Sequence, residues 1–186
     1  MRDPAAGRAL WGWQATVYYT AVEEFHPGPT VEVTGCLVLD CTQGRDDLGR
    51  YRGSFVDAVR AEGTGRTLDG QFLNWSYDVG YWLDDTARDT AGRRLRPFES
   101  AAADPAVLAA GTHFGLVTCG RGEADEVIPG PVCARLTTAR WTVVDEFTPG
   151  LGGDRHVDLY IGEETGPGFT DGAWYTTLIG AGLRID

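Results

Sequence analysis

The sequence predicts a mainly β protein, either a small barrel or a sandwich, on three observations. Short runs rich in β-branched and aromatic residues follow one another along the 186 residues. Glycine- and proline-rich turn signals separate these runs at regular intervals. Hardly any stretch shows the 3.6-residue apolar period of a helix. Because a chain of this length with a hydrophobic fraction of 42% suits one packed core, we expect residues 1–186 to form a single domain.

In the first half of the chain, aromatic and β-branched segments predict the strands. Residues 11–25 alternate loosely between apolar and polar and form the first expected strand, which the Pro- and Gly-rich residues 26–29 end. Residues 31–40 are also expected to be extended. Periodicity leaves residues 54–60 open between a short strand and a helical turn. Turn glycines followed by aromatic residues predict a hairpin or a groove wall over residues 62–83.

In the second half, a charged connection precedes the remaining strands. Residues 84–100 contain few apolar side chains and indicate a surface segment, and residues 105–110 could form one short turn of helix. The later strands are expected at 113–119, 133–145, 156–161 and within 174–185. Two of them carry the aspartates on which the functional interpretation depends.

Net charge limits the classes of partner. The formal charge is −11 and the pI is about 4.6, and every basic residue is an arginine. Binding to nucleic acid or to an anionic membrane surface depends on clustered basic residues, so this composition disfavours both. We also expect no membrane span, because no apolar run is long enough to cross a bilayer.

The four cysteines are even in number and lie in two local pairs, which suits two disulfides formed in an oxidising compartment. Three pairings are possible, and we expect Cys36 with Cys41 and Cys119 with Cys133 because each pair brackets a turn. Zinc is the rival, but no spacing is of the Cys-x-x-Cys type and the three histidines are scattered, so we expect neither metal nor cofactor. The N-terminus lacks the apolar core of a signal peptide. The paired cysteines lead us to expect an extracytoplasmic or secreted protein. Because its N-terminus lacks that apolar core, we expect that the signal peptide has been removed.

Residues 141–162 contain two strand-like runs joined by a Pro- and Gly-rich connection, each with one aspartate, Asp145 and Asp158. The second run alternates cleanly, so that His156, Asp158 and Tyr160 share one face of the strand. The opposite face is apolar. A polar face of this kind can be a functional site or an ordinary solvated surface, and the pattern alone does not choose between them.

Four stretches together resemble one family. They are Thr16–Thr20, Glu62–Arg66 with Asp69, Gly70 and Tyr77, Ser100–Thr112 with Asp104, and the 141–162 segment. In this order they resemble the 3D-domain proteins, named for three aspartates on a double-psi β-barrel, and most closely the MltA type of lytic transglycosylase. The resemblance implies a six-stranded double-psi β-barrel with a small inserted β subregion. Residues of about 44–98 would form this insertion, or a reduced second lobe.

The resemblance also implies a site. Asp158 corresponds to the single catalytic aspartate, which acts first as acid on the glycosidic oxygen and then as base on the 6-hydroxyl of the sugar. Asp145 would raise the pKa of Asp158 through like-charge repulsion. The alternative is that both carboxylates accept hydrogen bonds from loop amides. The chain departs from the family where Glu-Phe-Thr-Pro follows Asp145 in place of Thr-Gly-Gly, and its short second lobe implies a reduced groove.

Further residues are expected to contact substrate, and the expected partner is a polysaccharide or peptidoglycan glycan strand bound by a monomer. Aromatic side chains could stack on sugar rings, although such residues more often belong to the core. His156 shares the face of Asp158 and could tune it. The predicted substrate-binding residues are Tyr19, Thr20, Trp75, Tyr77, Asp104 and His156.

Two other functions stay open at this point. Related double-psi barrels include carbohydrate-binding and protease-inhibiting modules without catalysis, and the altered connection after Asp145 and the acidic charge favour that class. The barrel could also have been recruited to small-molecule chemistry. No spacing of Ser, Cys and His indicates a nucleophile–base pair.

Overall fold

The computed structural model describes residues 7–148 and 151–186, and the chain divides into two compact units. The first unit contains the chain up to Tyr18 together with Arg96–Ile161 and Thr170–Asp186, and the second contains Tyr19–Leu95 and Gly162–Phe169. Most of the predicted lobe at residues 44–98 lies in the second unit. The interpretation of the chain as one domain with an insertion stays a prediction.

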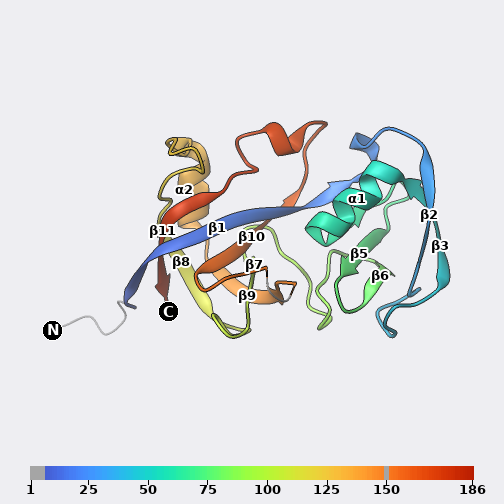
Figure 1. Ribbon diagram of the computed structural model, residues 1–186, viewed down its shortest axis with the longest axis horizontal. Helices are drawn as coiled ribbons and strands as arrows, with labels where there is room; N and C mark the ends of the chain where they lie inside the picture. Colours follow the sequence, from blue (N-terminus) through green and yellow to red (C-terminus); the bar gives the residue numbers. More distant parts are fainter. Residues whose placement is uncertain (1–6, 149–150) are drawn as a thin grey trace. The chain divides into compact units, whose positions relative to one another are not determined.

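The first unit is a closed six-stranded mixed β-barrel (Figure 1), so the predicted mainly β barrel fold is confirmed. The strands pair in the order β10-β7-β9-β8-β11-β1, and a further pairing of β10 with β1 closes the ring. Strands β7 and β9 run parallel, whereas β8 pairs antiparallel with both β9 and β11. The six strands are β1 (Ala9–Val22), β7 (Ser100–Ala103), β8 (His113–Thr118), β9 (Trp141–Glu146), β10 (His156–Glu163) and β11 (Leu178–Ile185). The last residues of β1 (19–22) and of β10 (162–163) are counted in the second unit.

Alternate side chains of these strands fill the barrel. The apolar face of β10 is buried, as its period-2 pattern predicts, and small alanines on β7 leave room for larger side chains opposite them. This interior fixes which face of each strand is left for a site. The fully buried barrel residues include Val157, Leu159, Ala101, Ala103, Phe114, Trp141, Leu178 and Leu183.

Helix α2 (Gly130–Thr138) corrects the sequence-based prediction of a strand from residue 133. Pro131 suits the first turn of a helix, where its missing N–H group leaves no hydrogen bond unmade. Val132 and Leu136, four residues apart, are buried on one face. The threonine hydroxyls of Thr137 and Thr138 bond back to carbonyls one turn earlier. The strand itself begins only at Trp141.

The second unit consists of two small groups of strands and one helix. Helix α1 (Gly53–Glu62) settles residues 54–60 as helical. It packs so closely on β4 that a Cβ at Gly65 would lie 2.4 Å from a Val59 methyl carbon and 2.6 Å from the Phe55 ring. Only glycine fits there. The remaining elements are β2 (Thr30–Gly35) paired with β3 (Asp46–Arg52), the series β4 (Thr64–Arg66), β5 (Phe72–Ser76) and β6 (Gly80–Asp84), and the 3-10 turns η1 (Glu23–Phe25) and η2 (Phe169–Asp171).

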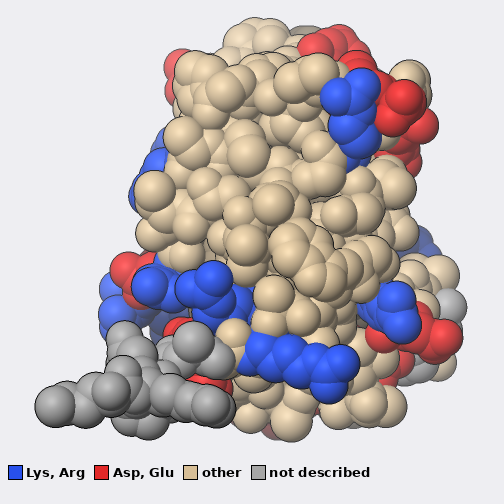
Figure 2. Space-filling view, turned by 90° about the vertical axis from the view of Figure 1, so that its left-hand side faces the viewer, with Lys and Arg blue, Asp and Glu red and all other residues tan. Residues whose placement is uncertain are grey.

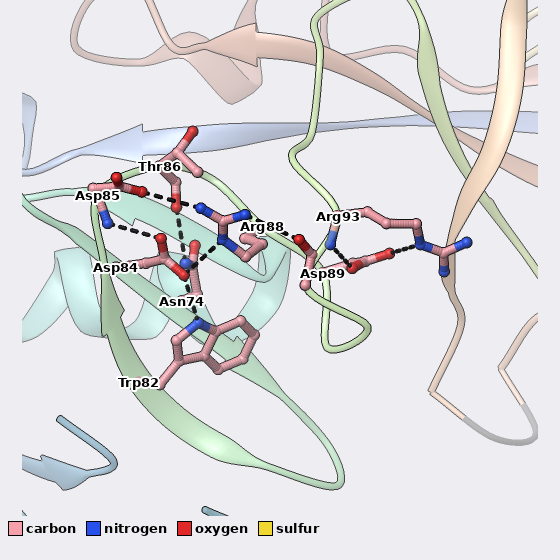
Figure 3. Close-up of polar contacts among 9 residues, drawn as sticks. Asn74, Trp82, Asp84, Asp85, Thr86, Arg88, Asp89 and Arg93 are labelled. Carbon is pink, nitrogen blue, oxygen red and sulfur yellow. Dashed lines mark hydrogen bonds and ion pairs between the residues drawn. The ribbon is translucent and has the colours of Figure 1, made fainter. Parts of the chain in front are cut away.

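Ion pairs order the charged connection after β6 within the second unit (Figure 3). The Arg88 guanidinium donates to Asp84 at 2.9 Å and to Asp85 at 3.1 Å, and Arg93 donates to the buried Asp89 at 2.7 Å. Burial raises the pKa of Asp89, and the hydrogen bonds and charge of Arg93 oppose that rise. These contacts are all local to the unit, which suits a structural role.

Both predicted disulfides are present, joining Cys36 to Cys41 and Cys119 to Cys133. The second one fastens α2 to the end of β8. In the described part of the chain no helix is long and apolar enough to cross a membrane. Nor do the described His, Cys, Asp and Glu side chains form a group of three that could hold a metal ion.

Candidate acid–base site on the barrel

Asp158 and Asp145 lie in one row across three neighbouring strands of the first unit. Asp158 on β10 pairs with Ala102 on β7, and Ala102 pairs in turn with Asp145 on β9. Paired residues of neighbouring strands project to the same face, so the small Ala102 side chain separates two carboxylates on one face. With strands about 4.8 Å apart, the two backbones lie about 10 Å from each other. Both aspartates are partly exposed.

A β-bulge in β9 turns Asp145 toward that face. Trp141 and Val143 point into the barrel, and strict alternation would send Asp145 the same way. However, the consecutive residues Ala101 and Ala102 pair with Val143 and Asp145, so Val144 is an extra residue in β9. The insertion reverses the alternation after Val143. Asp145 therefore joins Asp158 on the outer face.

Strand β1 contributes Tyr18 to the site. The Tyr18 hydroxyl donates to Asp145 Oδ2 at 3.3 Å, and its ring lies 5.3 Å from the ring of Tyr160, which shares the face of Asp158. Burial raises the pKa of Tyr18 well above its ordinary value, and the charges of Asp145 and Asp158 raise it further. The phenol therefore keeps its proton and serves as a fixed donor.

Thr16, two residues earlier on β1, lies between Asp158 and His156. Its Oγ1 is 2.9 Å from Asp158 Oδ1 and 2.7 Å from His156 Nε2. The other ring nitrogen, Nδ1, is 3.0 Å from the carbonyl oxygen of Gly152. Phe147 packs against the imidazole with ring centroids 4.7 Å apart. The histidine is thus held on several sides.

These surroundings suit proton transfer near neutral pH. Burial raises the pKa of Asp158 from 3.8 to about 7, the nearby Asp145 charge adds to the rise, and the Thr16 hydrogen bond opposes it. Burial lowers the pKa of His156. At pH 7 Asp158 therefore exists in comparable amounts as acid and as carboxylate, the condition under which a group can both donate and accept a proton.

The predicted site residues Asp145, Asp158 and His156 come together, whereas Asp104 has local contacts. Asp104 follows β7, where its Oδ1 accepts a hydrogen bond from the Ala106 N–H group at 2.8 Å. Its carbonyl oxygen accepts from two further amides of the same turn. These bonds shape the turn, and a role of Asp104 in binding substrate stays a prediction.

The other predicted substrate-binding residues belong to the second unit. Tyr19 is buried against Phe169, with ring centroids 5.0 Å apart, and Thr20 is fully buried. The guanidinium of Arg60 lies over the Trp75 ring, 5.5 Å from its centroid. Tyr77 is 61% exposed. Binding of substrate by these four residues stays a prediction.

Sequence reasoning missed Thr16 and Tyr18, which lie in the same five-residue stretch as Tyr19 and Thr20. Alternation along β1 could have placed Thr16 and Tyr18 on one face, but aromatic side chains occupy both faces, and Tyr18 and Tyr19 are equally buried. The bulge at Val144 left no signal in the sequence.

A cleft of about 640 Å³ lies in the first unit beside the beginning of β1. Trp11, 56% exposed, forms part of it, and so does Arg155, the neighbour of His156 in the chain. Figure 2 shows the side of the molecule at the left of Figure 1, where arginines gather in the lower part although the whole chain is acidic. The cleft is lined by Arg8, Ala9, Leu10, Trp11, Trp13, Ala106, Val107, Leu108, Asp154, Arg155 and Ile185.

Comparison with known proteins identifies the fold. No family model and no curated protein sequence matches the chain. Among solved structures, the fold is that of the MltA-type lytic transglycosylases. Escherichia coli MltA with bound chitohexaose matches with a TM-score of 0.55 and 14% identity over 93% of this chain and 71% of that one. A membrane-bound lytic murein transglycosylase from Agrobacterium tumefaciens gives a TM-score of 0.57 and 10% identity over 97% and 76%. At these identities the likeness is one of fold.

Proposed function

We propose that this protein cleaves the glycan strand of peptidoglycan as a lytic transglycosylase, with Asp158 as the single acid and base. The observation that carries this proposal is the partly exposed Asp158 carboxyl, whose pKa is raised to about 7 on a face shared with Asp145. A carboxyl with that pKa holds a proton near neutral pH and can also take one back. The fold it shares with lytic transglycosylases supports the same chemistry.

The reaction needs one proton, which leaves Asp158 and returns to it. The Asp158 carboxyl protonates the glycosidic oxygen as the bond from that oxygen to C1 breaks. The resulting carboxylate then removes the proton from the 6-hydroxyl of the same sugar as its oxygen bonds to C1. The products are a free hydroxyl on the leaving sugar and a 1,6-anhydro ring, and Asp158 is again protonated. Water is not consumed, so a second carboxylate is not needed to activate it, unlike in most glycosidases.

Asp145 and Tyr18 would support this cycle without transferring the proton. The negative charge of Asp145 disfavours a second negative charge on Asp158 and so keeps the acid protonated. The hydrogen bond from Tyr18 fixes the Asp145 carboxylate. The cleft with the exposed Trp11 offers an aromatic surface on which a sugar could stack.

Digestion of purified sacculi tests the proposal. The parent protein should release soluble anhydromuropeptides, identified by mass spectrometry, and Asp158→Asn should lower the rate about 10²- to 10⁴-fold because it removes the general acid. Asp145→Asn should have a smaller effect. The matched control is Asp57→Asn, an exposed carboxylate on α1, which should not change the rate.

Absence of anhydro products from the folded parent protein would contradict the enzyme proposal. A non-catalytic glycan-binding protein is the second candidate, favoured by the exposed Trp11 in a cleft with two arginines. That function would appear as sedimentation of the protein with sacculi without release of product. The two disulfides support a location outside the cytoplasm for either function.

A further inference from the structure

Three hydrogen bonds connect the Gly152 carbonyl to Asp158 through His156 and Thr16. The distances are 3.0 Å from Gly152 O to His156 Nδ1, 2.7 Å from His156 Nε2 to Thr16 Oγ1, and 2.9 Å from Thr16 Oγ1 to Asp158 Oδ1. All four residues lie in the first unit. The chemistry of the groups determines where each hydrogen can be.

The hydrogen bond between His156 and the Gly152 carbonyl fixes the tautomer of the histidine. A carbonyl oxygen only accepts, so the hydrogen of the first bond must be on His156 Nδ1. In a neutral imidazole Nε2 then carries no hydrogen and must accept. Among the described residues, the group hydrogen-bonded to Nε2 is the hydroxyl of Thr16, which has a single hydrogen to donate.

The tautomer of His156 in turn determines which group donates in the hydrogen bond between Thr16 and Asp158. When Thr16 donates to His156, its oxygen can only accept from Asp158, so the carboxyl is in its protonated form. When Asp158 is ionised, the Thr16 hydrogen is needed at the carboxylate instead, and Nε2 keeps its partner only if the imidazole is protonated. With a neutral imidazole, loss of the Asp158 proton therefore breaks one hydrogen bond.

We infer that Thr16 and His156 are positioning residues that give Asp158 a hydrogen-bond partner both before and after it loses the acid proton. The Thr16 hydroxyl accepts from the carboxylic acid and donates to the carboxylate, and His156, fixed as the Nδ1–H tautomer, is the alternative acceptor for the hydroxyl hydrogen. This inference rests on the proposed role of Asp158 as acid and base.

The inferred exchange requires only a rotation of the hydroxyl. As Asp158 gives its proton to the glycosidic oxygen, the Thr16 hydrogen turns from His156 Nε2 to the new carboxylate. It turns back when Asp158 receives the proton of the 6-hydroxyl. A single residue that must be acid and base in one cycle thus has a partner suited to each form.

The other titratable groups on this face favour the protonated acid. Asp145 on β9 places a negative charge near Asp158. Tyr18 on β1 and Tyr160 on β10 are buried phenols, and the raised pKa of Tyr18 keeps it neutral. Burial also lowers the pKa of His156, in agreement with a neutral imidazole that accepts at Nε2.

Nitrogen-15 NMR of the imidazole of His156 tests the inference without any measurement of activity. In the full-length parent protein at pH 7, we expect the Nδ1–H tautomer with an unprotonated, hydrogen-bonded Nε2. Thr16→Val, which nearly preserves shape and removes the hydroxyl, should change the Nε2 resonance, and Thr16→Ser should restore it. A neutral Nε2–H tautomer in the parent protein would overturn the inference.

Kinetics supply the second readout. Thr16→Val should lower kcat/KM on sacculi about tenfold or more, which corresponds to the loss of a hydrogen bond to a charged group. Because the Thr16 hydrogen bond lowers the pKa of Asp158, its loss should also move the alkaline limb of the pH profile, which reports the acid, to higher pH. Thr16→Ser should recover most of the rate. An unchanged pH profile in a folded Thr16→Val protein would refute the inferred role of Thr16. If the parent protein releases no anhydro product, the proposed function fails, whereas the tautomer result stands independently.

Discussion

In the folded protein, the surroundings of Asp158 disfavour the ionised form of its carboxyl group. Its neighbours on the same face are aromatic rings and a second carboxylate, and its hydrogen bond to Thr16 compensates only partly. In the unfolded chain an aspartate ionises near pH 4. Ionisation of Asp158 therefore lowers the stability of the folded protein between about pH 4 and pH 7.

Asp158→Asn should make the protein more stable at neutral and alkaline pH. Because the folded-state pKa is raised, the parent protein loses stability as pH rises from about 4 to about 7, and asparagine is free of this loss. At about 1.4 kcal/mol per pH unit the gain is at most about 4 kcal/mol above pH 7, and it should vanish near pH 3. Urea unfolding across this pH range measures the difference. Parallel stability curves for the two proteins would contradict the assignment.

At the level of single residues, sequence reasoning succeeded where one face of a strand was purely apolar. Strand β10 has that pattern, and its alternation placed His156, Asp158 and Tyr160 together correctly. On β1, both Tyr18 and Tyr19 are buried, so apolar character cannot tell which of them faces the site. Asp145 was singled out as the aspartate of the first strand-like run of residues 141–162, but its orientation depends on the bulge at Val144, which is set by pairing with β7.

Among the elements, the region of α2 was predicted wrongly as a strand, and it also carries a disulfide. Threonine-rich residues before Trp141 resemble a strand, but Pro131 and the buried pair Val132 and Leu136 belong to a helix, whose Cys133 is joined to Cys119. Tertiary contacts of this kind override weak local propensity.

The two disulfides should differ in their contribution to stability. Loop-closure entropy predicts about 3 kcal/mol for the Cys119–Cys133 bridge, with a sequence separation of 14, and about 2 kcal/mol for Cys36–Cys41, with a separation of 5. Replacing each pair by serines and measuring urea unfolding gives both values. We expect the Cys119–Cys133 variant to be the less stable, and the reverse order would show that native packing outweighs chain entropy.

For the whole molecule, the strongly negative charge matters if the substrate is an anionic wall polymer. With a net charge of −11, long-range repulsion slows encounter, although arginines gather on the face shown in Figure 2. Raising the ionic strength from about 0.01 M to about 0.15 M shortens the screening length from about 30 Å to about 8 Å. We expect kcat/KM on sacculi to rise several-fold over this range. A fall with added salt would indicate that attraction by the arginines dominates.

The pairing of β1 with β11 has a consequence for how the molecule is made. Ala9 lies opposite Arg184, so the ring of strands contains contacts between residues separated by nearly the full length of the chain. Such pairings are entropically costly to form and slow folding. During synthesis β1 must wait for its partners β10 and β11, and until then its hydrogen-bonding edges are open to pairing with other chains. The barrel can close only after the last strand has emerged, so folding follows synthesis instead of accompanying it.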